Sequence, residues 1–268
     1  MGHVVERALR GRCDLLVVDR TRAPLQEAEP EVDAAVVCVK THGNAWAADI
    51  AERVLKPDGV AITIQNGLGN YEPLRAAVGA ERAAVGVIYV GARLEDGALS
   101  ATGPGRVEIG PPGAAGPRRA LQDLAELMRA GGMTVTLVDD PWPSVWRKLV
   151  TNAAVNPTSA LFGYTNEELL RDVAAARVAD GLAAEVARVA TAAGVPIDER
   201  EARTWWRDMA RLTGANRSSM LQDVQAGRPT EVDAICGAVH REGERHGVEA
   251  PLSQAMRVLV GSLTTDRD

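Results

Sequence analysis

The first half of the chain alternates short apolar runs, rich in β-branched residues, with stretches of helical character. The apolar runs lie at residues 14–18, 33–39, 59–64, 84–90, 106–110 and 133–137, and the helical stretches include 1–10, 44–55 and 118–130. Apolar strands separated by helices are typical of a mostly parallel sheet covered on both faces. After residue 140 the strand signals stop and helical patterns take over. The sequence therefore predicts a Rossmann-like α/β domain at 1–140 and an all-helical domain at 141–268.

Composition excludes several classes of function. The 268 residues carry a net charge of -6 and only 3% aromatic side chains, which argues against nucleic acid and anionic membranes as partners. No apolar run is long enough to span a bilayer, and the N-terminus lacks a signal-peptide pattern. Three scattered cysteines and four histidines form neither a CxxC pair nor metal-ligand spacing. We expect a cytoplasmic protein with reduced thiols and no bound metal.

The start of the chain fits the middle of a dinucleotide-binding βαβ unit. A helix at 1–10 runs into the strand predicted at 14–18, and Gly2 takes the place of the third glycine of a G-x-G-x-x-G fingerprint. We therefore expect a sheet that lacks its first strand. Asp19 and Arg20 follow the strand at 14–18. An acid there binds a ribose hydroxyl and an arginine suits a 2′-phosphate, so the choice between NADH and NADPH stays open, and an ordinary strand-end turn explains both residues equally well.

Lys148, Asn152 and Asn156 form one polar row, at i, i+4 and i+8, on an otherwise apolar helix. A helix that is apolar around most of its girth is largely buried, and a buried ammonium and two carboxamides need partners. Together they are a good receptor for a carboxylate or a carbonyl oxygen. The alternative is a solvated stripe on a surface helix, since lysine is mostly exposed in proteins.

Four motifs in this order resemble the ketopantoate reductase (2-dehydropantoate 2-reductase) family. They are VVCVKT at 36–41, QNGLGN at 65–70, WRKLVTNAAVNP at 146–157 and SSMLQDVQAGRPTEVD at 218–233. The resemblance implies a Rossmann domain followed by a helical domain, with the active site in the cleft between them. It also implies a homodimer formed through the helical domain, and a reaction that belongs to pantothenate biosynthesis.

The resemblance assigns roles to individual positions. Lys148 matches a lysine that donates a proton to the substrate carbonyl oxygen, and Glu231 matches a glutamate implicated in catalysis. The substrate-binding positions are Asn152, Asn156, Asn166 and Ser219, and Asp223, one helical turn after Ser219, is expected to face the same cleft. The cofactor-binding positions that it implies are Arg20, Lys40, Asn66 and Ala92, and the register of the glycine fingerprint adds Gly2.

Purely structural roles could also explain several of these residues. Glu231 lies in TEVD, which is also a capping box at a helix start, and residues 65–69 could be only a turn. Asp223 could be a structural partner for an arginine.

The leading hypothesis is an NADPH-dependent reductase of ketopantoate or a related branched 2-keto acid, with Lys148 as general acid. The rival is a redox-inactive member that binds a carboxylated ligand or catalyses an isomerisation or cyclisation. It is motivated by the missing first strand and by the short segment at 21–32, which would impair the NADPH site.

Overall fold

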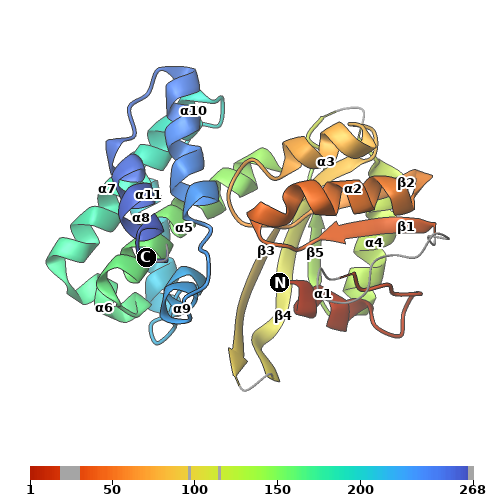
Figure 1. The fold of residues 1–268 in the computed structure, drawn as a ribbon, viewed down its shortest axis with the longest axis horizontal. Coiled ribbons are helices and arrows are strands. Elements are labelled where there is room, and N and C mark those ends of the chain that lie inside the picture. The colour runs from red at the N-terminus through yellow and green to blue at the C-terminus, as the bar shows by residue number, and fades with distance from the viewer. Residues whose placement is uncertain (19–30, 96–97, 114–115, 265–268) are drawn as a thin grey trace. The chain divides into compact units, whose positions relative to one another are not determined.

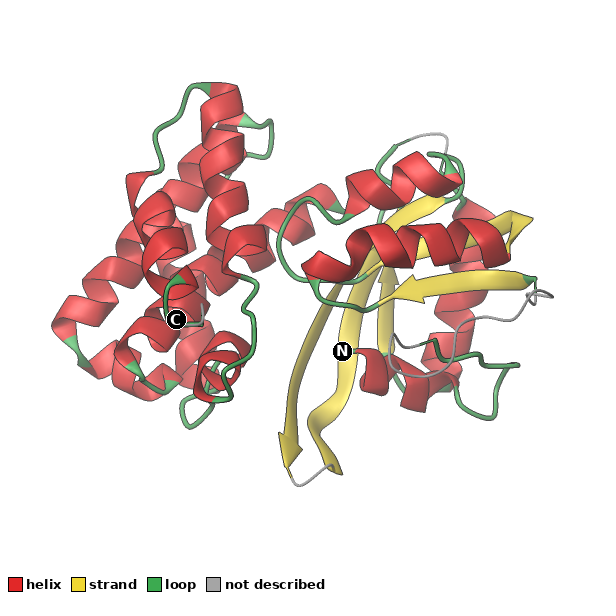
Figure 2. Cartoon of the chain, in the orientation of Figure 1, coloured by secondary structure: helices red, strands yellow, loops and turns green. Residues whose placement is uncertain are grey.

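The computed structural model describes residues 1–18, 31–95, 98–113 and 116–264. They form two compact units. The first comprises Met1–Gln65 and Asn70–Pro141, and the second comprises Asn66–Gly69 and Trp142–Asp268. Figure 2 shows strands in the first unit and only helices in the second.

The first unit is built around a five-stranded sheet in the order β1-β2-β3-β4-β5. Its strands are β1 (Val32–Val37), β2 (Leu55–Thr63), β3 (Ala83–Glu95), β4 (Ala98–Gly110) and β5 (Thr134–Leu137). The pairs β1–β2, β2–β3 and β4–β5 are parallel, whereas β3–β4 is an antiparallel hairpin. The predicted mostly parallel sheet is therefore confirmed.

Helices cover both faces of this sheet, because alternate residues of the strands are apolar in both directions (Figure 1). Val60 and Ile62 on β2, and Ile64 directly after the strand, pack on α1 (Gly2–Leu9) and α4 (Arg118–Ala130). Ala61, between them, faces α2 (Asn44–Val54) and α3 (Tyr71–Val78). A short 3₁₀ turn, η1 (Thr41–Gly43), leads from β1 into α2.

The strand predicted at residues 14–18 is wrong. These residues have no regular secondary structure, and the nearby backbone pairing is a single bridge between Arg10 and Cys13. Leu16 and Val17 are 47% and 43% exposed. A β-branched run becomes a strand only where a neighbour completes its hydrogen bonds. Among the described residues the sheet thus begins at β1, in agreement with the expectation that the first Rossmann strand is lacking.

The second unit is a helical bundle arranged around α5 (Trp142–Phe162), which is buried along most of its length. The other elements are α6 (Asn166–Arg171), α7 (Val173–Ala192), α8 (Glu199–Leu212), α9 (Ser219–Gln225), the π-helical turn η2 (Asp233–Gly237), α10 (Ala238–His246) and α11 (Pro251–Gly261). Helices α7, α8, α9 and α11 all contact α5, which explains why apolar residues surround so much of its girth.

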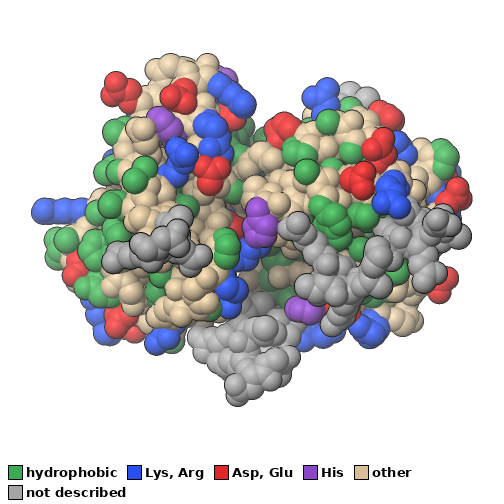
Figure 3. All heavy atoms as spheres, in the orientation of Figure 1, with side chains coloured by type: hydrophobic (Ala, Val, Ile, Leu, Met, Phe, Trp, Pro, Cys, Tyr) green, Lys and Arg blue, Asp and Glu red, His purple; other side chains and the backbone are tan. Residues whose placement is uncertain are grey.

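The described helices include none with the combination of length and apolar character that crossing a bilayer requires. On the face drawn in Figure 3, acidic and basic side chains are interspersed on each unit. All three cysteines are free thiols, with Cys236 fully buried.

Candidate active site

Lys148 lies on the first half of α5 and is partly buried. Burial lowers the pKa of its ammonium from the ordinary 10.5 to about 8, and the Glu231 carboxylate opposes that shift by favouring the charged form. The buried side chains around α5 therefore tune this lysine toward neutral pH. An amine with a pKa near the working pH is well suited to hold and release a proton.

Glu231 is positioned by the segment between α9 and η2, and it contacts a residue that is distant in sequence. The amide Nδ2 of Asn66 donates a hydrogen bond to Glu231 Oε2 at 3.1 Å. Asn66 follows β2 but belongs to the second unit together with Gly67, Leu68 and Gly69. The helical unit thus gathers an ammonium, a carboxylate and a carboxamide from three parts of the chain.

Asn152 and Asn156 continue the row of Lys148 along α5. Asn152 is partly buried and Asn156 is 8% exposed. Both lie on the helix that carries Lys148, so their amides extend its polar row by two turns. The row is part of a helix packed by neighbours, which excludes the alternative of a stripe on a solvated surface helix.

The structure places other predicted substrate residues in contacts of their own. Asn166, at the start of α6, is 4% exposed and donates to Thr213 Oγ1 at 2.7 Å. Asp223 on α9 is 6% exposed and accepts from Arg228 Nε at 3.0 Å. Asp223 thus has the arginine partner that its structural interpretation requires, and substrate contacts by Asn166 and Asp223 remain predictions.

Ser219 is the first residue of α9 and is exposed, whereas the preceding Ser218 is buried and caps the helix. Ser218 Oγ accepts from the backbone N–H of Leu221 at 3.1 Å and shares a hydrogen bond with Ser159 on α5. Sequence reasoning missed the role of Ser218. The signal was present, because serine is a preferred N-cap residue.

The helix-start interpretation of Glu231 is confirmed in part: Thr230 Oγ1 accepts from the backbone N–H of Val232 at 3.4 Å, and the Glu231 carbonyl oxygen accepts from the backbone N–H of Ile235 at 3.1 Å. The residues after Glu231 form η2, a π-helical turn whose N-cap, Val232, makes no capping bond through its side chain. The Glu231 carboxylate also accepts from Asn66 and favours the charged form of Lys148. Glu231 thus lies at a helix start and contacts Asn66, and its part in catalysis remains a prediction.

In the first unit, groups that suit a phosphate-bearing ligand lie where β1 ends. A Cβ added to Gly2, at the start of α1, would lie 3.4 Å from Cys38 Cβ, so this helix begins against the end of β1. Lys40 follows two residues later, and the buried Thr41 Oγ1 has no hydrogen-bond partner within the described chain. A helix N-terminus, a cation and a hydroxyl at the carboxyl edge of parallel strands fit the pyrophosphate of a dinucleotide.

Two further residues, Arg20 and Ala92, were predicted to bind the cofactor. Arg20 lies outside the described residues. Ala92 is in β3, opposite Ala101 of β4.

A buried chain of amides in the first unit was not anticipated. Asn44 Oδ1 accepts from Gln65 Nε2 at 2.6 Å, and Asn44 Nδ2 donates to Asn70 Oδ1 at 2.9 Å. Thr63 Oγ1 donates to Gln65 Oε1 at 2.8 Å, so the chain of contacts reaches back to β2. All four residues are buried. Asn44 therefore joins Gln65 and Asn70, the two residues that flank Asn66–Gly69 in sequence.

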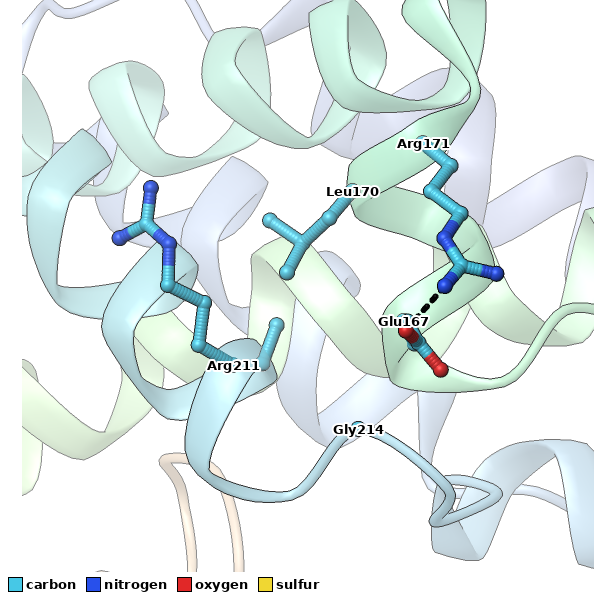
Figure 4. Close-up of a pocket in the computed structure, with 6 residues that line it drawn as sticks. Glu167, Leu170, Arg171, Arg211 and Gly214 are labelled. Carbon is cyan, nitrogen blue, oxygen red and sulfur yellow. Dashed lines mark hydrogen bonds and ion pairs between the residues drawn. The ribbon is translucent and has the colours of Figure 1, made fainter.

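A hollow between α6 and α8 contains none of the predicted site residues (Figure 4). Its arginines already have acidic partners. Arg171 pairs with Glu167, and Arg211 pairs with Asp208 at 2.6 Å. In the part of the chain that is described, no cluster of three or more histidine, cysteine or acidic side chains is placed to hold a metal ion.

Comparison with known proteins gives one consistent family. Residues 5–113 match the family described as ketopantoate reductase PanE/ApbA, and residues 141–263 match its C-terminal domain. The chain is 34% identical over 272 residues to the 2-dehydropantoate 2-reductase of Halobacterium salinarum, covering 97% of this chain and 88% of that protein. It is 34% identical over 235 residues to the protein of the same name from Archaeoglobus fulgidus, covering 87% and 77%.

Solved structures agree. The 2-dehydropantoate 2-reductase from Geobacter metallireducens GS-15 has a TM-score of 0.78 at 28% identity, covering 87% of this chain and 78% of that one. D-mandelate dehydrogenase, solved as a ternary structure with NADH and anilino(oxo)acetate, has a TM-score of 0.82 at 25% identity, covering 89% and 78%.

Proposed function

The chain belongs to the ketopantoate reductase family, and on that premise we propose that it is an NADPH-dependent reductase of ketopantoate or a related branched 2-keto acid. The observation that carries the proposal is the cluster of Lys148, Glu231 and Asn66, with a lysine pKa of about 8. Lysine at this pKa is protonated at neutral pH yet gives up its proton readily, as a general acid must.

The reduced nicotinamide, when bound, supplies the hydride that attacks the keto carbon. Reduction leaves negative charge on the carbonyl oxygen, and the Lys148 ammonium stabilises that charge and transfers the proton from Nζ to it. Asn152 and Asn156, one and two turns along α5, orient the keto acid through their amides. Glu231 keeps Lys148 charged before the reaction, because its carboxylate favours the ammonium.

Gly2, Lys40 and Asn66 are proposed to contact the dinucleotide, with Ala92 lining its site and Arg20 binding the 2′-phosphate. Ser219 is proposed to bind the substrate carboxylate, and Asn166 and Asp223 are proposed to contact other parts of the substrate. Preference for NADPH over NADH depends on Arg20 and Asp19, since an arginine suits the 2′-phosphate and an acid repels it.

The test is oxidation of NADPH and of NADH by the purified chain with ketopantoate and with phenylglyoxylate, an aromatic 2-keto acid. The second substrate is included because D-mandelate dehydrogenase is among the similar structures. We expect turnover of ketopantoate with NADPH. If no combination of these cofactors and acids is turned over, the protein is not such a reductase, and the redox-inactive hypothesis remains.

We also propose that the protein is cytoplasmic and a homodimer that assembles through its helical unit. Leu252, Val258 and Leu259 of α11 are 39%, 62% and 48% exposed. Covering such apolar side chains with a partner removes them from water and stabilises the dimer. Sedimentation velocity should give the mass of a dimer, and Val258→Glu should shift it toward a monomer. A monomer for the unmodified chain would contradict this part of the proposal.

A further inference from the structure

Residues 66–69 belong to the helical unit, although Gln65 and Asn70 on either side belong to the first unit. We call residues 66–68 the docked turn. Besides the bond from Asn66 to Glu231, the backbone N–H of Leu68 donates to the carbonyl oxygen of Ala234 at 3.0 Å. The docked turn is thus held at both of its ends by the segment that carries Glu231.

Gly67 lies between those two hydrogen bonds, and its backbone packs directly against Ala234. Its φ is +82°, and a Cβ added there would lie 2.2 Å from the Ala234 oxygen and 2.7 Å from its carbonyl carbon. Only glycine can combine this backbone conformation with such a contact. Gly69 has a similar φ of +79°, but a Cβ added there would meet nothing within 4 Å. The two glycines therefore differ in their surroundings and not in their backbone.

The Ala234 carbonyl group, which Gly67 and Leu68 contact, belongs to a segment with several contacts of its own. Ala234 lies in η2, a π-helical turn, which is a rare conformation found frequently at functional sites. The carboxylate of Asp233, at the start of η2, accepts from Arg257 Nε at 2.9 Å and from Arg241 Nη1 at 3.1 Å. Ala234 itself is 3% exposed. The docked turn therefore contacts a buried residue in a segment that is tied to α10 and α11 through Arg241 and Arg257.

We propose that Gly67 is a positioning residue for the reduction, because its contact with the Ala234 carbonyl seats the docked turn so that Asn66 holds the Glu231 carboxylate beside Lys148. The inference rests on the proposed function and deepens it. A side chain at residue 67 must push the turn away from η2. The hydrogen bond from Asn66 Nδ2 to Glu231 Oε2 is then lost, and the carboxylate is no longer held by the turn in its position beside the lysine.

The variants Gly67→Ala and Gly69→Ala separate the contact from backbone strain, since both put alanine at a positive φ and only the first meets the Ala234 carbonyl. Gly194→Ala, with φ +93° and open space, is the control remote from the site. Hydrogen exchange of the Leu68 amide should lose its protection in Gly67→Ala and keep it in Gly69→Ala. The Lys148 midpoint, followed by NMR of labelled lysine, should fall below the wild-type value of about 8 in Gly67→Ala alone.

Activity gives a third readout. A small misplacement of catalytic groups costs about 100-fold in turnover, and we expect a loss of that order in kcat for Gly67→Ala relative to Gly194→Ala. Leu68 protection and a Lys148 midpoint in Gly67→Ala equal to those of wild type would overturn the positioning role, whatever the activity. A wild-type chain without reductase activity would refute the proposed function instead, and the two NMR readouts would still decide this inference. Should Gly67→Ala fail to fold, Asn66→Ala must lower the Lys148 midpoint, and an unchanged midpoint there would refute the inference.

Discussion

Ser253 places both its backbone N–H and its hydroxyl 2.8 Å from Oε2 of Glu185. Oε1 of the same carboxylate accepts from the backbone N–H of Leu252, also at 2.8 Å. Glu185 lies on α7 and is 2% exposed, and the N-cap residue of α11, Ala250, makes no capping bond through its side chain. A buried carboxylate from one helix thus caps the N-terminus of another, where free N–H groups and the helix dipole favour negative charge.

Glu185→Gln should therefore destabilise the helical unit. The amide keeps the shape of the side chain but loses the charge and turns a donor toward N–H groups. We expect a loss of about 2 to 3 kcal/mol in the free energy of unfolding, measured by urea denaturation. Glu244→Gln on α10, where the side chain is 67% exposed, should change it by less than about 0.5 kcal/mol. Equal effects in the two variants would contradict the capping role.

Lys148→Met should abolish reduction and remove the pH dependence of stability that Lys148 causes. Burial lowers the pKa of Lys148 from 10.5 to about 8, so the folded state disfavours the ammonium at neutral pH. That cost is fully present below pH 8, and it disappears as the pH rises from about 8 to 10.5. Wild type should therefore gain on the order of 2 to 3 kcal/mol in unfolding free energy relative to the variant between pH 7 and pH 10, measured by chemical denaturation. The same difference between wild type and variant at both pH values would contradict this assignment.

Glu231→Gln should move the pH profile of reduction. The carboxylate raises the pKa of Lys148, so its neutralisation should lower that pKa below about 8. Because the general acid must be protonated, kcat falls as the pH rises through this pKa, and the fall should begin at lower pH in the variant. The measurement is kcat for ketopantoate against pH, with Glu126→Gln on the exposed face of α4 as the control. Coincident profiles would show that Glu231 does not act on the lysine.

Asn44→Ala should destabilise the first unit. The substitution removes two buried hydrogen bonds, from Gln65 Nε2 to the Asn44 amide and from the Asn44 amide to Asn70 Oδ1. Each buried hydrogen bond contributes about 0.5 to 1.5 kcal/mol, so we expect a loss of about 1 to 3 kcal/mol in the free energy of thermal or urea unfolding. Gln122→Ala, at an exposed position of α4, is the matched control. A loss no greater than that of the control would mean that the amide chain contributes nothing to stability.

Much of the fold could be predicted from local pattern. The apolar runs from residue 33 onward became β1 to β5, and the helix predicted at 118–130 has the bounds Arg118–Ala130. These predictions succeed because the alternation of apolar residues determines which face of an element can be buried. The run at 14–18 has the same local composition and is not a strand, because pairing depends on a neighbour that local pattern cannot supply.

The same distinction between local pattern and tertiary contacts applies to the candidate site. The sequence by itself determined the row of Lys148, Asn152 and Asn156, since spacing along one helix follows from its 3.6-residue turn. Only the tertiary structure joined Asn66 to Glu231 and seated Gly67 on Ala234, because these contacts bring together residues far apart in the chain. Tertiary packing also set the lysine pKa, which depends on the burial and charge of groups that surround it in space.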